Sequence, residues 1–376
     1  MSSELKYLVC SDIHLGHRKT PTLHIANSFR KCILNKHNRD VRIIFIGGDL
    51  FDRLLDVNSK DILIILELMD QLLNYCYTNK IKLRVLEGTP SHDWNQPQIL
   101  AKLNDLRTEN KPDLRYFKNL DIEFMPEENK HVLYIPDEWT HCHDSLEKQI
   151  EEKLNQYAIS QVDIAIMHGQ FQYQFAGIPY KGFYFRENYF LNLVKDFIHV
   201  GHYHNYTTFD RIIANGSLER LAHRQEEDKG YVVVKGNSYT FIKNEDAYTY
   251  KTIPVTKRST LNTLDKAINQ YPDNSYLRIQ MTRDHPFNIG FQELKLRYMD
   301  QNLERLVKGD DTDTGITSDV LSDNELEVLD SFIIDTNIKE TLKAIVVAKY
   351  DLTPTEFSKF DGYLEVFNNL DVVESH

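Results

Sequence analysis

The feature that most constrains the fold is a unit of strand, polar loop and helix that occurs three times at the start of the chain. The apolar runs 6–10, 41–47 and 81–86 are typical of strands, and the second is the continuous β-branched run of a strand buried on both faces. Helical patterns follow at 23–38 and at 58–79. Ligand sites in such α/β sheets lie at the carboxyl ends of the strands, so we expect the functional residues at that edge.

Acidic and histidine residues stand at these strand ends. Further strands are predicted at 162–167 and 196–200, and each of them also leads into histidine. His202 and His204 are one residue apart after Gly201, and alternation along a strand places them on the same side. The candidate ligands are Asp12, His14, Asp49, Ser91, His92, His168, His202 and His204.

This mixture of carboxylates and imidazoles indicates a metal centre. It suits Mn²⁺, Fe²⁺ or Zn²⁺ better than Ca²⁺ or Mg²⁺. The groups are too many for one ion, whereas two ions roughly 3.5–4 Å apart, bridged by one carboxylate, would use them all. Such a pair is suited to in-line displacement at phosphorus.

Five short motifs occur in a fixed order: DxH at 12–14, GDxxD at 48–52, a glycine-led HD at 88–93, HG at 168–169 and GHxH at 201–204. Together they resemble the calcineurin-like metallophosphoesterase family. The segments 215–220 (NGSLER) and 226–233 (EEDKGYVV) are similar to SbcD-type DNA repair nucleases, as are DIHLGH at 12–17 and GGDLFD at 47–52. The resemblance covers roughly residues 6–235. The family has phage-encoded members, and this chain resembles them as well.

The resemblance implies the site residues. One metal would take Asp12, His14, Asp49 and His204, and the other would take Asp49 as the bridge, the Ser91 position, His168 and His202. His92 would contact the scissile phosphate and help to protonate the leaving oxygen.

One motif departs from the family pattern, which has Asn directly before the catalytic histidine. This chain has Ser91 there, after two inserted residues. A serine hydroxyl is a weaker ligand than an amide carbonyl. The alternative donors for the second metal are therefore a water molecule, Thr89 or a backbone carbonyl.

Several residues near the motifs have more than one reading. Asp52 is a candidate catalytic residue that orients a ligand, contacts DNA or caps its loop. The aromatic and basic stretch 180–186 fits either contacts with unpaired bases and phosphates or ordinary loop packing. The candidate DNA contacts are therefore Lys181 and Arg186, with His17 as a further candidate.

The net charge of −12 lies entirely in residues 309–376, which hold 16 acidic and 4 basic residues. The preceding 308 residues are balanced, so the overall charge does not argue against DNA as a substrate. We expect a nuclease domain at 1–250, a small α+β capping domain at 251–308, a linker at 309–319 and a helical partner-binding tail at 320–376. An apolar stripe in that tail, made of Phe357, Phe360, Leu364 and Phe367, is the expected docking face.

These observations predict an α/β protein with a metallophosphoesterase two-sheet sandwich flanked by helices. The expected function is a Mn²⁺-dependent DNA exonuclease and endonuclease with two metal ions, for which Mg²⁺, Fe²⁺ and Zn²⁺ are alternatives. It would act as a homodimer with an SbcC-type ATPase. The rival functions are a phosphoprotein phosphatase or small-molecule phosphodiesterase, and a non-catalytic DNA-tethering scaffold. Scattered cysteines and the absence of an apolar membrane segment predict a cytoplasmic protein.

Overall fold

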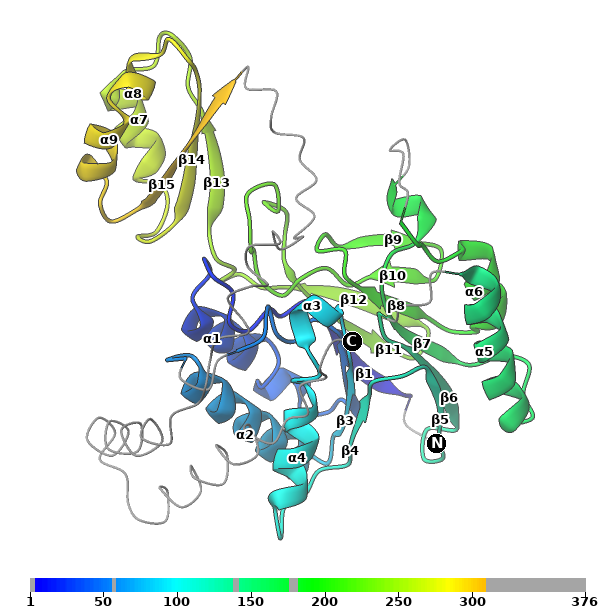
Figure 1. Cartoon of the computed structure of the whole chain (residues 1–376). Coiled ribbons are helices and arrows are strands. Elements are labelled where there is room, and N and C mark those ends of the chain that lie inside the picture. The colour runs from blue at the N-terminus through cyan, green and yellow to red at the C-terminus, as the bar shows by residue number, and fades with distance from the viewer. Residues whose placement is uncertain (1–3, 56–58, 138–141, 176–181, 309–376) are drawn as a thin grey trace, which may run out of the picture. The chain divides into compact units, whose positions relative to one another are not determined.

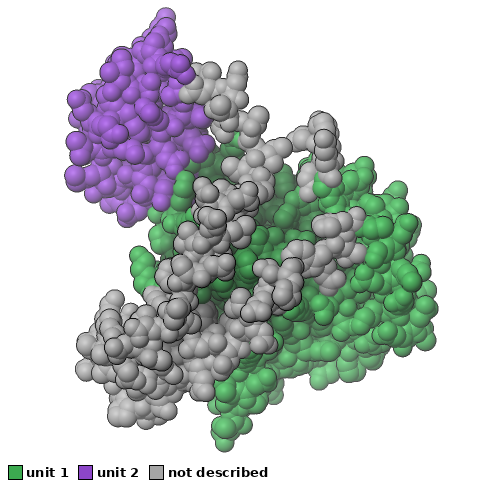
Figure 2. All heavy atoms as spheres, viewed as in Figure 1, with its two compact units in different colours: residues 1–248, 361–376 green, residues 249–360 purple. Residues whose placement is uncertain are grey.

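The computed structural model describes residues 4–55, 59–137, 142–175 and 182–308. These residues form two compact units, the first ending at Tyr248 and the second beginning at Thr249 (Figure 2). The predicted linker at 309–319, the predicted tail at 320–376 with its stripe of Phe357, Phe360, Leu364 and Phe367, and Lys181 all lie outside the described residues.

The first sheet of unit 1 has the strand order β12-β11-β1-β2-β3-β4 (Figure 1). β1 to β4 run parallel, and the β11–β12 hairpin adds antiparallel to β1 through the turn at Gly236, whose φ is 55°. The bounds are β1 (Lys6–Cys10), β2 (Ile43–Gly47), β3 (Lys82–Leu86), β4 (Leu114–Phe117), β11 (Gly230–Lys235) and β12 (Ser238–Lys243).

The second sheet has the order β5-β6-β7-β8-β10-β9. β6, β7, β8 and β10 run parallel, and β5 and β9 are antiparallel edge strands. The bounds are β5 (Asp121–Met125), β6 (Lys130–Ile135), β7 (Ile164–His168), β8 (Ile198–Gly201), β9 (Thr207–Phe209) and β10 (Ile212–Ala214).

Helices cover the outer face of each sheet (Figure 1). α1 (Thr22–Cys32), α2 (Ile62–Asn79) and α4 (Gln98–Leu106) pack on the first sheet, and α5 (His143–Gln156) and α6 (Glu187–Leu193) pack on the second. Short helices lie at α3 (Pro90–Asp93), η1 (Lys36–Asn38) and η2 (Gln172–Phe175). Within the described residues, no helix is both long and apolar enough to span a membrane.

The apolar core has three layers, which explains the continuous apolar strands. Leu8 and Cys10 of β1 face the helices, whereas Tyr7 and Val9 face the second sheet. The first layer lies between the first sheet and its helices, the second fills the space between the two sheets, and the third lies under α5 and α6. Because alternate side chains point to opposite faces, a strand between two apolar layers has no polar face. The predicted fold class, a two-sheet α/β sandwich flanked by helices with a small additional unit, is confirmed.

Unit 2 is a three-stranded parallel sheet with helices. Its strands are β13 (Tyr250–Pro254), β14 (Tyr276–Thr282) and β15 (Asn302–Lys308), in that order across the sheet. Its helices are α7 (Leu261–Ile268), α8 (Pro286–Ile289) and α9 (Phe291–Arg297). Its core includes Leu264, Leu277, Ile279 and Phe291. A capping box of Thr260 and Thr263 starts α7.

The first helix is shorter than the sequence pattern indicated. The prediction was 23–38, but α1 ends at Cys32. The Asn35 side chain donates to the carbonyls of Lys31 and Cys32, and the Asn38 side chain donates to those of Cys32 and Ile33. These amides satisfy carbonyl groups that a continuing helix would have bonded, so the chain ends the helix there.

Candidate metal centre

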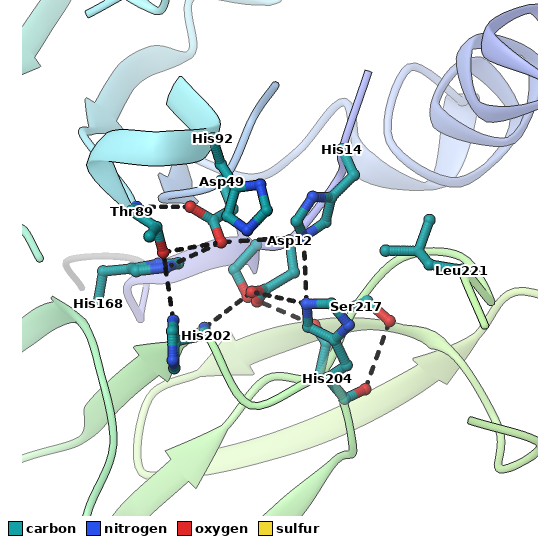
Figure 3. A network of polar contacts seen from close by, with 12 residues as sticks. Asp12, His14, Asp49, Thr89, His92, His168, His202, His204, Ser217 and Leu221 are labelled. Atoms are coloured by element: carbon teal, nitrogen blue, oxygen red, sulfur yellow. Dashed lines mark hydrogen bonds and ion pairs between the residues drawn. The ribbon is translucent and has the colours of Figure 1, made fainter. Parts of the chain in front are cut away.

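The aspartate and histidine side chains singled out in the sequence meet where the carboxyl ends of the two sheets adjoin (Figure 3). The first sheet supplies those that follow β1, β2 and β3, and the second supplies those at the ends of β7 and β8. The set consists of Asp12, His14, Asp49, Asp52 and His92 from the first sheet, and His168, His202 and His204 from the second.

The backbone of this edge is unusual. Asp12, His14, Asp49 and His202 have φ angles of 51°, 54°, 49° and 92°, a left-handed region that costs non-glycine residues on the order of 1–3 kcal/mol. The turn after β1 is held in this shape because the Ile13 and His14 amides both donate to the Asp49 carbonyl, at 2.8 and 3.1 Å. Backbone strain of this kind is common at functional sites, because it directs side chains to positions that a regular helix or strand does not reach.

Glycines let the strand ends approach closely. A Cβ on Gly48, whose φ is 91°, would lie 2.2 Å from His168 Nδ1, and one on Gly88 would lie 2.1 Å from the Asp49 nitrogen. A Cβ on Gly201 would lie 2.5 Å from the Gly47 carbonyl oxygen. Glycine at these positions therefore brings the ligand-bearing loops of both sheets together.

The first group of donors consists of Asp12, His14 and His204, whose ligand atoms lie within 4.8 Å of one another. His14 Nε2 lies 3.1 Å from His204 Nε2, which in turn lies 3.7 Å from Asp12 Oδ1. Asp12 Oδ1 accepts from the His202 amide at 2.8 Å, whereas Asp12 Oδ2 is buried with no hydrogen-bond partner. A buried carboxylate oxygen without a donor is costly, and a cation would satisfy it.

The second group consists of Asp49, His168 and His202, again within 4.8 Å. His168 donates from Nδ1 to the Gly47 carbonyl at 2.8 Å, and its Nε2 lies 3.2 Å from Asp49 Oδ2. The same Asp49 oxygen lies 3.8 Å from His14 Nε2 in the first group. Asp49 thus stands between the two groups, where a bridging carboxylate would stand.

Ser91 does not join this second group. Ser91 is exposed, and its carbonyl accepts from Trp94 Nε1 at 2.8 Å. The structure instead places the Thr89 hydroxyl against Asp49, His168 and His202 (Figure 3). The reason is that Pro90 begins α3, so Ser91 lies inside that short helix and turns away, whereas Thr89 is still in the loop.

His92 lies beside the first group, with its ring in edge-to-face contact with that of His14 at 5.0 Å. Its Nδ1 is 2.6 Å from the Asp52 carbonyl, to which it donates, so Nε2 is the nitrogen that can exchange a proton with a ligand. The Asp52 carboxylate lies 3.2 Å from His14 Nδ1. Of the readings of Asp52, the contacts favour orientation: its side chain holds His14 and its carbonyl holds His92.

Asp93 joins the loops after β2 and β3. It is fully buried, and its two oxygens accept from the Phe51 amide at 2.9 Å and the Gly88 amide at 2.7 Å. The carboxylate therefore fixes the loop of Asp49 and Asp52 against the loop that carries His92.

Burial and charge together set the ionisation of the cluster. Burial, reinforced by the nearby charge of His168, lowers the pKa of His202 to about 4, and burial also lowers the pKa of His204 well below its usual value. At His168 burial acts in the same direction, but the Asp49 carboxylate outweighs it and raises the pKa to about 10. The pKa of Asp49 is correspondingly held well below its usual range despite burial. In the absence of a metal, the positive charge of protonated His168 thus offsets the negative charge of Asp49. A bound cation would offset the same charge.

These observations fit a centre for divalent metal ions. The donors are imidazoles and carboxylates that are buried in both aspartates, His14 and His168 and partly buried in the other histidines, and Asp12 Oδ2 has no protein partner. Three overlapping groups have the spacing of metal ligands: Asp12, His14 and His204; His14, Asp49 and His92; and Asp49, His168 and His202. Such nitrogen and oxygen donors suit Mn²⁺, Fe²⁺ or Zn²⁺.

Of the predicted DNA contacts, neither His17 nor Arg186 belongs to the donor groups. The His17 ring accepts through Nδ1 from the amides of Lys19 and Thr20, which shapes the loop after β1. Arg186 is exposed and forms an ion pair with Glu147. Lys181 lies outside the described residues.

Sequence reasoning missed two residues that hold His204. Gln225 Nε2 lies 2.8 Å from His204 Nδ1, and Lys229 Nζ donates to the His204 carbonyl at 2.6 Å. Burial lowers the pKa of Lys229 to about 8. A signal for Lys229 was its place directly before the apolar run of β11, whereas nothing in the spacing marked Gln225.

A two-sheet α/β sandwich with histidine and aspartate clusters at its edge is consistent with a metallophosphoesterase sandwich of the calcineurin-like type that carries a candidate metallohydrolase site. No protein-family model and no curated protein matches the chain. Among solved structures, one crystal structure aligns over 64% of this chain and 100% of its own, at 11% identity and a TM-score of 0.39. A likeness of that size carries no argument, so the class rests on the architecture and the geometry of the site.

Proposed function

We propose that the chain is a metal-dependent phosphodiesterase that cleaves DNA, a nuclease of the SbcD type. The observation that carries the hydrolytic part is the two donor groups at the junction of the two sheets, with Asp49 standing between them. When bound there, divalent ions supply positive charge that lowers the pKa of water and neutralises phosphate oxygens.

The chain's own residues prepare this chemistry. Asp52 holds His14, and the Gly47 carbonyl holds His168, so both rings present Nε2 to the site. His92, fixed through Nδ1 to the Asp52 carbonyl, keeps Nε2 free to donate a proton to the leaving sugar oxygen. The buried setting excludes water from one side of the cluster and strengthens its electrostatics.

DNA is proposed as the substrate because of the segment 215–220, which resembles SbcD-type nucleases in sequence. The segment is joined to the metal centre: the Ser217 amide donates to the His204 carbonyl at 3.0 Å, and Ser11 donates to the Gly216 carbonyl at 3.3 Å. His17, Lys181 and Arg186 remain candidate DNA contacts. An SbcC-type ATPase as partner, binding through residues 320–376, a homodimer and Mn²⁺ as the metal belong to the same proposal.

The test is digestion of linear duplex and hairpin DNA by the purified protein with Mn²⁺, with and without an SbcC-type ATPase. We expect cleavage that depends on metal and that the ATPase stimulates with ATP. Asp49→Asn serves as the inactive variant, and Asp40→Asn, at an exposed aspartate that pairs with Lys6 and belongs to no donor group, is the matched control.

Each rival function has its own outcome. Hydrolysis of phosphopeptides or cyclic nucleotides with no DNA cleavage would favour a phosphatase or small-molecule phosphodiesterase. DNA binding without hydrolysis of any phosphoester, at saturating Mn²⁺, would favour a tethering scaffold.

A further inference from the structure

The Thr89 hydroxyl occupies the middle of the second donor group (Figure 3). Its Oγ1 lies 3.2 Å from Asp49 Oδ2, 3.3 Å from His168 Nε2 and 3.2 Å from His202 Nδ1. The Thr89 amide also donates to Asp49 Oδ1 at 2.6 Å. One residue therefore contacts all three members of the group and both oxygens of the shared carboxylate.

These spacings match those of ligands around one ion. Metal–ligand distances of about 2.0–2.1 Å in a tetrahedral site place neighbouring ligand atoms about 3.3–3.4 Å apart. The three distances from Thr89 Oγ1, and the 3.2 Å between Asp49 Oδ2 and His168 Nε2, are close to that edge length. Four of the six distances among the four donors thus match a tetrahedral site, and the donor atoms of Asp49, His168 and His202 all lie within 4.8 Å of one another.

A second observation concerns the helix that follows. Thr89 is the N-cap residue of α3, and threonine at this position commonly bonds the amides of the first helical turn. Its side chain makes no such bond here. The Thr89 hydroxyl faces the donor group and not the amides of the helix. Its position is therefore explained by contacts in the site and not by helix capping.

Charge distinguishes the two groups. Asp12 belongs to the first group, and Asp49 Oδ2 lies within 3.8 Å of His14 there. The second group has only the shared Asp49, two imidazoles and a neutral hydroxyl. Fewer carboxylates and a weaker donor give a lower affinity for a divalent cation.

We propose that Thr89 Oγ1 is the fourth protein donor to a divalent ion held by Asp49, His168 and His202, and that this ion binds more weakly than the ion at Asp12, His14 and His204. The second ion then enters only at high free metal, so metal concentration regulates the centre. The inference rests on the metal-dependent part of the proposed function, but it concerns metal binding and requires no particular substrate.

The test is a Mn²⁺ titration of the metal-free full-length protein by calorimetry, with electron paramagnetic resonance on the same samples. For the natural sequence we expect two binding steps of different affinity and a spin-coupled signal after the second. Thr89→Val keeps the shape and the amide but removes the oxygen. Because changes even outside the coordination shell cost about 10–100-fold in affinity, the weaker step should weaken at least about tenfold and the coupled signal should disappear.

Matched variants separate the outcomes. Thr89→Ser keeps the hydroxyl and should retain both steps, and Ser91→Ala removes an exposed hydroxyl two residues away and should change neither. Thr89→Ala gives the same reading should Thr89→Val not fold. Two steps of unaltered affinity in Thr89→Val, loss of its tighter step as well, or equal affinities in the natural sequence would each overturn the proposal. Since no substrate is present, a failed DNA-cleavage assay leaves this result unaffected.

Discussion

Asp49 is the residue on which both donor groups depend, because its Oδ2 lies 3.8 Å from His14 Nε2 and 3.2 Å from His168 Nε2. We predict that Asp49→Asn removes both metal ions and all hydrolysis, since an amide cannot offset the repulsion between two cations. Metal analysis of the purified variant after dialysis against Mn²⁺ measures this. Two retained equivalents of metal would refute the bridging role, and Asp40→Asn controls for the loss of a carboxylate.

We propose that His92 transfers a proton and is not needed to hold a metal, although its ring stands with His14 and Asp49 in one of the three ligand-spaced groups. His92→Ala should leave the metal content unchanged and lower turnover by about 10²–10⁴-fold, the usual effect of one proton-transfer group. The loss should shrink with a nitrophenyl ester, whose leaving group departs without a proton. Equal losses on DNA and on the nitrophenyl ester would instead assign His92 to positioning. His37→Ala, at an exposed site, is the control.

At the scale of single elements, β8 carries His199, a fully buried histidine close to Tyr7 and Asn215. Burial lowers the pKa of His199 from 6.5 to about 4, so the folded state resists its protonation while the unfolded state does not. The stability due to neutral His199 is present above pH 6.5 and is lost as the pH falls toward 4. The expected loss is about 3 kcal/mol.

Urea unfolding between pH 4 and 7 in the presence of chelator measures this effect. The free energy of unfolding should depend less on pH in His199→Gln than in the natural sequence. His202 and His204 also titrate but are common to both proteins, so the difference between the curves isolates His199. Parallel curves would contradict the prediction.

The strands were the most predictable elements. β1 has the predicted bounds, and β2 and β3 begin one or two residues later than expected, because apolar runs buried on both faces are unambiguous. The short strands β4, β9 and β10 were not delimited from the sequence, since three or four residues give too little periodicity.

The ligands of the metal centre were also most predictable where they adjoin a buried strand. A residue at the end of a buried strand has its position set by the strand, as for Asp12, Asp49 and His168. In the loop after β3 the position depends on where α3 begins. The resemblance implied the Ser91 position, with Thr89 among the alternatives, and it is the Thr89 hydroxyl that contacts the second group. Gln225 was beyond prediction as a partner of His204, because tertiary packing alone brings it there, and the position of Lys229 before β11 did not indicate which group it contacts.

At the scale of the whole molecule, charge is divided along the sequence. Residues 309–376 hold 16 acidic and 4 basic residues, whereas every candidate ligand lies before residue 205. Acidic segments repel DNA, so we propose that this part contacts a protein, with the stripe of Phe357, Phe360, Leu364 and Phe367 as anchors.

We predict that a chain ending at Lys308 keeps its metal content and its basal cleavage of DNA but no longer binds an SbcC-type ATPase. Co-purification with the ATPase and ATP-stimulated cleavage measure the loss. A truncated protein that fails to fold, or that binds the ATPase with unchanged affinity, would show that residues 309–376 have a different task.

The division of the ligands between the sheets has a further consequence. Asp12 and Asp49 extend from the first sheet, and His168 and His204 from the second, up to 192 positions away in the sequence. An ion between them acts as a cross-link that only the folded chain can form. At a free metal concentration one hundred times its dissociation constant, such an ion adds about 2.7 kcal/mol to the free energy of unfolding. We therefore expect the protein to be more susceptible to proteases when metal is scarce, since less of it is held in the folded state.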